Sequence, residues 1–68
     1  MRNDLKVKSI LRKAGYPIIK YNKSIVIENG IEVIQQYGVV AISLRGLAKE
    51  EDINKLLDNS NIEYCIFE

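Results

Sequence analysis

The chain has 68 residues, of which 47% are apolar, with one cysteine, no histidine and a formal net charge of +1. A chain of this length forms one domain with a small core. One cysteine excludes an internal disulfide, and a lone thiol without histidine excludes a structural zinc site. We therefore expect a second copy of the chain to supply the missing stabilisation, as a homodimer. No apolar run is long enough to span a membrane, and charges interrupt the N-terminus where a signal peptide would be apolar, so we expect a cytoplasmic protein.

Charge is distributed unevenly along the chain. Residues 1–24 carry seven cationic side chains against one acidic residue, and residues 25–68 carry three against eight. The two parts therefore have net charges near +6 and −5. Such a separation favours an anionic partner, a charge-matched protein or a second copy of the chain.

The first predicted element is an amphipathic helix over residues 4–14. Its apolar residues recur at the spacing i, i+3, i+4, i+7, namely Val7, Ile10, Leu11 and Ala14. Asn3 or Asp4 is available as the N-cap, and Gly15 supplies a stop, followed by Pro17.

Residues 18–28 are rich in β-branched and aromatic side chains, which predicts strands with a tight turn at Asn22-Lys23. Asn29-Gly30 is a stronger turn signal, because both residues tolerate positive φ. It predicts a hairpin in which residues 25–28 pair with residues 31–34. In that register the facing pairs are Val26 with Val33, Ile27 with Glu32, and Ile25 with Ile34.

Residues 31–37 also permit a second interpretation. Asn29 followed by Glu32 resembles a helix cap, and Gly38 could end a helix of about two turns. The sequence leaves strand and helix open here.

The C-terminal half predicts a β-α-β unit. Residues 39–44 are nearly all apolar, which predicts a central strand covered on both faces and ended by Gly46. A helix over residues 49–58 follows, with three acidic residues in its first turn and an apolar stripe of Ile53, Leu56 and Leu57. After a loop at residues 59–61, residues 62–67 alternate in the strand period, so this strand and residues 39–44 are expected to be parallel neighbours.

The expected fold is a single α+β domain over residues 1–68. It comprises an N-terminal helix, a β-meander of three to four strands, then a helix and a final strand, which together make a mixed sheet of four or five strands.

The residue inventory argues against an enzyme and against a cofactor or metal site. Histidine is absent, and Cys65 lies in a predicted strand where we expect a buried, inert thiol. Glu50, Glu51 and Asp52 are consecutive, so a helix would splay them apart rather than aim them at one cation. The four glycines are too far apart for a phosphate-binding loop.

We therefore expect a non-catalytic binding or regulatory module that acts by protein–protein interaction. Its partner-binding residues would be the cationic and aromatic side chains of the N-terminal part: Lys6, Lys8, Arg12, Lys13, Tyr16, Lys20, Tyr21 and Lys23. Leu5 and Tyr37 are also expected near an interface, although core packing is as good an explanation for each tyrosine.

Nucleic-acid binding is the alternative, with the same lysines on phosphates and Tyr16 and Tyr21 available for stacking. A sequence pI of 7.8 lies below the usual range of basic nucleic-acid-binding domains. A composition rich in isoleucine, lysine and asparagine is typical of AT-rich genomes and favours a bacterial or phage accessory protein that modulates a host factor.

Overall fold

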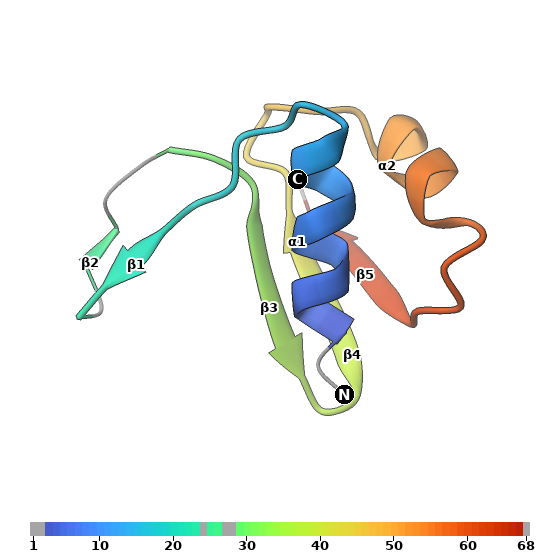
Figure 1. Cartoon of the computed structure of the whole chain (residues 1–68), viewed down its shortest axis with the longest axis horizontal. Coiled ribbons are helices and arrows are strands. Elements are labelled where there is room, and N and C mark those ends of the chain that lie inside the picture. The colour runs from blue at the N-terminus through green and yellow to red at the C-terminus, as the bar shows by residue number, and fades with distance from the viewer. Residues whose placement is uncertain (1–2, 24, 27–28, 68) are drawn as a thin grey trace.

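The computed structural model of the chain describes residues 3–23, 25–26 and 29–67. These residues form an α+β fold with a three-stranded mixed sheet, two helices and a separate two-stranded ribbon (Figure 1). In chain order the elements are α1 (Asn3–Lys13), β1 (Tyr21–Asn22), β2 (Ile25–Val26), β3 (Glu32–Gln36), β4 (Val39–Ser43), α2 (Glu50–Leu57) and β5 (Tyr64–Phe67).

Helix α1 spans Asn3–Lys13, within one residue at each end of the predicted range 4–14. Val7 and Leu11 are buried on its inner side. At its C-terminus Gly15 adopts a φ of 92°, and the amides of Gly15 and Tyr16 donate to the carbonyls of Arg12 and Leu11, each at 3.0 Å. This pair of hydrogen bonds is a Schellman motif, which needs a residue with positive φ and so explains the glycine.

Residues 32–36 are a strand, so the helix interpretation of residues 31–37 is wrong. Strand β3 pairs antiparallel with β4, with Gln36 opposite Val39. Tyr37 and Gly38 connect them with φ values of 47° and 82°, and positive φ at both positions is what a type I′ hairpin turn requires. Gly38 therefore serves a β-turn rather than a helix end.

The hairpin predicted at Asn29-Gly30 is wrong. Strand β2 pairs with β1 in a separate sheet, with Tyr21 opposite Val26 and Asn22 opposite Ile25. The predicted partners Val33 and Ile34 belong to β3 and pair with β4 instead. Asn22 consequently lies in a strand rather than in the turn. The predicted pair of Ile27 with Glu32 involves a residue outside the described part of the chain.

Gly30 is needed for close packing rather than for a turn. A Cβ atom built on it would lie 2.8 Å from backbone atoms of Ile18 and Ile19 and 2.9 Å from the Pro17 carbonyl carbon. The Ile31 amide donates to the Pro17 carbonyl at 2.8 Å, and the Ile19 amide donates to the Ile31 carbonyl at 3.1 Å. This contact fixes the start of β3 against residues 17–19. Among the described residues the main sheet has three strands, so the predicted fourth and fifth strands are not confirmed. In place of the predicted meander, these residues form one hairpin and a separate ribbon.

The predicted β-α-β unit is confirmed. Strand β5 runs parallel to β4, which lies at the centre of the order β3-β4-β5. Helix α2 begins with its acidic turn and buries Ile53 and Leu57, whereas Leu56 remains 38% exposed. The Tyr64 hydroxyl of β5 donates to Asn54 Oδ1 of α2 at 2.7 Å, which ties the last strand to the helix.

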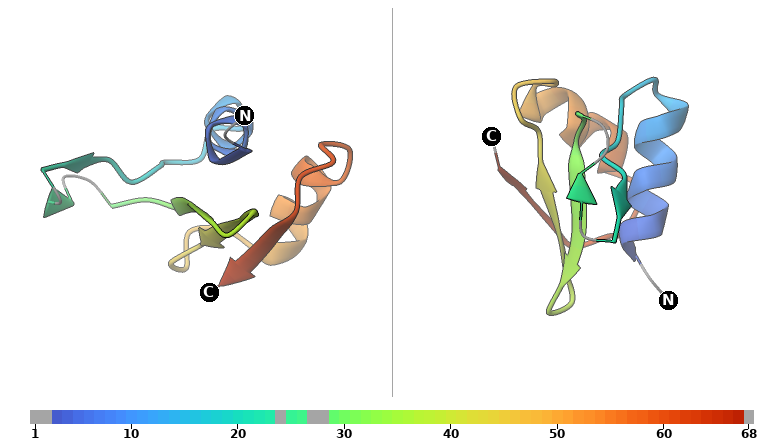
Figure 2. Two further views of the ribbon diagram at one scale, coloured as in Figure 1. Left: turned by 90° about the horizontal axis from the view of Figure 1, so that it is seen from below. Right: turned by 90° about the vertical axis from the view of Figure 1, so that its left-hand side faces the viewer.

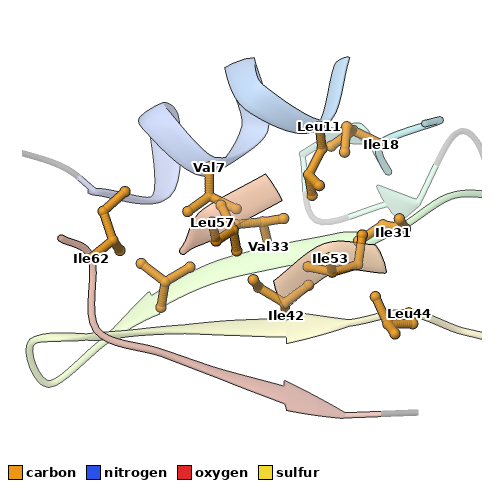
Figure 3. Packing of buried hydrophobic residues seen from close by; sticks show 11 residues of the cluster. Val7, Leu11, Ile18, Ile31, Val33, Ile42, Leu44, Ile53, Leu57 and Ile62 are labelled. Atoms are coloured by element: carbon orange, nitrogen blue, oxygen red, sulfur yellow. The ribbon is translucent and has the colours of Figure 1, made fainter. Parts of the chain in front are cut away.

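Both helices pack on one face of the sheet. Val7 and Leu11 of α1 and Ile53 and Leu57 of α2 belong to the same buried cluster as Val33 of β3 and Val40 and Ile42 of β4 (Figure 3). On β4 the alternate residues Val39, Ala41 and Ser43 are only half-buried. The prediction that this strand is covered on both faces is therefore wrong, because the chain supplies no layer for the second face within its described residues.

We predict that Gly30→Ala destabilises the fold more than Gly15→Ala. The new methyl group at residue 30 would overlap backbone that no rotamer change can move, which costs about 3 kcal/mol or more. At residue 15 nothing lies within 4 Å of the new Cβ, so only the left-handed φ is penalised, by about 1–2 kcal/mol. Urea denaturation of the two variants measures the difference. An equal or smaller cost at Gly30 would contradict the close packing described here.

Candidate binding surfaces

Three of the four predicted basic residues of α1 lie away from its buried side. Lys6, Arg12 and Lys13 are exposed, and Lys8 is half-buried. Leu5, the neighbour of Lys6 in the chain, is 54% exposed. We call Leu5, Lys6, Arg12 and Lys13 the helix surface.

Lys20, Tyr21 and Lys23 belong to the second group, on and beside the ribbon of β1 and β2. The ribbon extends away from the helices and the main sheet (Figures 1 and 2). All three side chains are exposed, and Lys23 lies at the ribbon turn with a φ of 50°. The structure therefore divides the predicted site residues between α1 and the ribbon instead of gathering them into one patch.

Tyr16 lies between the two groups. Its ring is half-buried and packs against the core cluster, directly after the end of α1. Part of the ring thus stabilises the fold, which limits what it can offer to a partner.

The ribbon is tied to the main sheet through a tyrosine. The Tyr21 hydroxyl donates a hydrogen bond to Glu32 Oε2 at the start of β3. This hydrogen bond raises the pKa of the Tyr21 phenol above its ordinary value of 10.0, and the negative charge of Glu32 adds to the effect while Arg45 opposes it. Because half of Tyr21 is still exposed, its ring remains accessible.

Sequence reasoning missed a third surface, the uncovered face of the main sheet. Residues that pair directly across a sheet project from the same face. Ile34 of β3, Ala41 of β4 and Cys65 of β5 are paired in this way. Further along, Gln36 pairs with Val39, and Ser43 pairs with both Glu32 and Phe67. We call this surface the open face: Glu32, Ile34, Gln36, Val39, Ala41, Ser43, Cys65 and Phe67.

The open face has an apolar centre with Glu32, Gln36 and Ser43 toward its ends, and it is hollowed. Ile34 is 37% exposed and Phe67 is 57% exposed. A hollow of about 170 Å³ lies on this face, lined by Gln36, Tyr37, Val39, Ala41, Cys65 and Phe67. Tyr37, in the β3–β4 turn, is fully exposed at its edge.

Cys65 is exposed, so the prediction of a buried thiol is wrong. The alternation of β5 was correct, with Ile62 buried and Tyr64 and Ile66 half-buried on the core side. Cys65 and Phe67 are on the other side, and that side is uncovered because α1 and α2 both pack on the opposite face. No local sequence pattern distinguishes the two faces of this strand.

A second hollow lies near the base of the ribbon. It has a volume of about 310 Å³ and is lined by Asn29, Gly30, Arg45 and Leu47. Arg45 supplies one cation there, at a turn with a φ of 53°. Among the described residues that line it, none is a carboxylate or thiol that could act as an acid, a base or a nucleophile.

Within the described ranges, no three histidine, cysteine, aspartate or glutamate side chains come together to hold a metal ion. Glu50, Glu51 and Asp52 are exposed around the first turn of α2, where they complement the helix dipole. Neither α1 nor α2 has the length and apolar character needed to cross a membrane.

No protein-family model, curated protein or solved structure matches this chain. Its function is therefore inferred from the three surfaces: the helix surface, the ribbon and the open face.

We predict that Glu32→Gln lowers the pKa of Tyr21, because the charged acceptor that holds the phenol proton is lost. The folded-state pKa is raised above 10.0, so stabilisation from this pair is present below pH 10 and is lost as the pH rises beyond it. Titration of the Tyr21 ring by NMR in both proteins measures the shift. An unchanged Tyr21 pKa in Glu32→Gln would show that the hydrogen bond does not form in solution.

Proposed function

We propose that this chain is a small non-catalytic binding module that docks on an acidic surface of a protein partner. The observation that carries the proposal is the helix surface, in which one leucine and three cations are exposed side chains of the same helix, α1. An apolar residue surrounded by charged groups is the usual composition of a docking site, in which the apolar centre supplies affinity and the charged rim supplies orientation and speed.

The position of the helix surface supports this role. It lies on the side of α1 that faces away from the core, so docking there requires no change in the fold. Backbone hydrogen bonds and the buried residues Val7 and Leu11 fix α1 in place, so its cations are presented on a rigid element. We further propose a cytoplasmic role as a bacterial or phage accessory protein that modulates a host factor.

One observation favours nucleic acid as a second candidate partner. The ribbon projects from the body and carries Lys20, Tyr21 and Lys23, and a two-stranded ribbon has the width to enter the major groove of DNA (Figure 2). Two observations argue against nucleic acid. The cations are few and divided between two elements, and a phosphate backbone offers no apolar group for Leu5 to contact. Protein docking uses the leucine as well as the cations and is therefore preferred.

We predict that the triple reversal Lys6→Glu, Arg12→Glu, Lys13→Glu removes partner capture and leaves the fold intact. The three side chains are exposed, so their replacement disturbs no buried contact. Immobilised wild-type and variant proteins are incubated with extract of the source organism after nuclease treatment, and the bound proteins are compared by mass spectrometry. A protein captured by the wild type at least tenfold more than by the variant is the expected result.

The matched control is the reversal Arg45→Glu, Lys49→Glu, Lys55→Glu, which changes the net charge equally but lies outside the helix surface. It should retain the captured protein. Equal losses in both variants would show a response to net charge alone. Binding of random-sequence DNA or RNA by the wild type, with an affinity that falls steeply with salt, would instead support the nucleic-acid candidate.

A further inference from the structure

The hollow near the base of the ribbon combines a cation, a polar side chain and an apolar side chain. Its lining consists of Asn29 and Gly30, which precede β3, and Arg45 and Leu47, which follow β4. Arg45 carries a full positive charge and five N–H donors, and the Asn29 amide adds two donors. Leu47 is 45% exposed and supplies the apolar part of the lining.

The backbone at Arg45 has a conformation that most side chains disfavour. The Leu47 amide donates to the Leu44 carbonyl at 2.9 Å, which closes a tight turn. The residues between them, Arg45 and Gly46, have φ values of 53° and 75°. Positive φ at both central positions is what a type I′ turn requires, and glycine, asparagine or aspartate normally occupies them. An arginine at residue 45 therefore destabilises the turn, and strain of this kind is concentrated at functional sites.

The charge of Arg45 is available to a ligand. Arg45 and Glu32 both lie close enough to Tyr21 to act on the pKa of its phenol. Glu32 already accepts a hydrogen bond from the Tyr21 hydroxyl, and Arg45 forms no ion pair within the described residues. An anion from outside the chain would thus meet a cation that this part of the structure does not neutralise.

We infer that this hollow binds a small carboxylic acid, with the carboxylate on Arg45 and an apolar tail on Leu47. The planar guanidinium matches the two oxygens of a carboxylate and can donate to both at once. One cation balances the single charge of a carboxylate, whereas a phosphate group carries a charge of about −1.5 to −2 at neutral pH. The Asn29 amide can donate a further hydrogen bond to the same carboxylate.

The size and rigidity of the hollow suit a ligand of this kind. Its volume of about 310 Å³ is roughly twice that of cavities of about 150 Å³ that accept one benzene ring. A carboxylate with a tail of several carbon atoms therefore fits. Gly30 is fixed by its close packing on residues 17–19, and the turn hydrogen bond holds Arg45 and Leu47, so binding orders little additional backbone.

Amide NMR of the wild type, titrated with isocaproate at constant ionic strength, tests the inference. We expect saturable shifts at residues 29–30 and 45–47 with a dissociation constant of about 1 mM, because the cation is exposed and the ligand has few atoms. Isocaproamide has the same shape without the charge and should bind at least tenfold more weakly. Acetate lacks the tail and should bind severalfold more weakly. Equal shifts with isocaproamide, or shifts spread over the cations of α1, would overturn the inference.

Substitution of Arg45 provides the second test. Arg45→Gln should weaken isocaproate binding at least tenfold, whereas Lys49→Gln removes the same charge from an exposed residue outside the lining and should leave binding unchanged. Arg45→Gly should also lose binding but unfold at a higher urea concentration, because glycine adopts positive φ without penalty. Undiminished binding in Arg45→Gln, or a lower urea midpoint for Arg45→Gly, would overturn the inference.

The carboxylic-acid site is independent of the proposed docking function. The triple helix-surface variant retains all four residues that line the hollow and should still bind isocaproate. Loss of isocaproate binding in that variant would overturn the assignment to this hollow, and loss of partner capture alone would leave it standing.

Discussion

The packing of both helices on one face of a three-stranded sheet is the constraint on which the rest of the structure depends. Val7 and Leu11 from α1 and Ile53 and Leu57 from α2 belong to one buried cluster with Ile42, so both helices cover the same face of the sheet. A chain of 68 residues has no further element with which to cover the second face within its described ranges. The small core and the open face are thus two consequences of the same arrangement.

This arrangement also separates the binding surfaces. The helix surface lies on the outer side of α1, and the open face lies on the side of the sheet that the helices do not cover. The ribbon projects away from the helices and the main sheet (Figure 2).

The sequence predicts those features that depend on local periodicity. Both helices and the parallel pair of β4 and β5 follow from the spacing of apolar residues and from the length of the crossover. The prediction of the strand that pairs with β3 is wrong because the sequence does not show which structural role a glycine has. Gly30 avoids a clash with residues 17–19, whereas Gly38 supplies a turn. The alternation of residues in β5 predicts which side chains share a face of the strand. It does not predict which face the helices cover, so the exposure of Cys65 could not be predicted from the sequence.

The central claim, that one face of the sheet is covered and the other is open, is tested most directly by methyl NMR with a soluble paramagnetic probe. The methyl signals of Ile34, Val39 and Ala41 should be strongly attenuated, and those of Val40 and Ile42 should be protected. Comparable protection of Ile34 and Ile42 would contradict the account, since both faces of the sheet would then be covered.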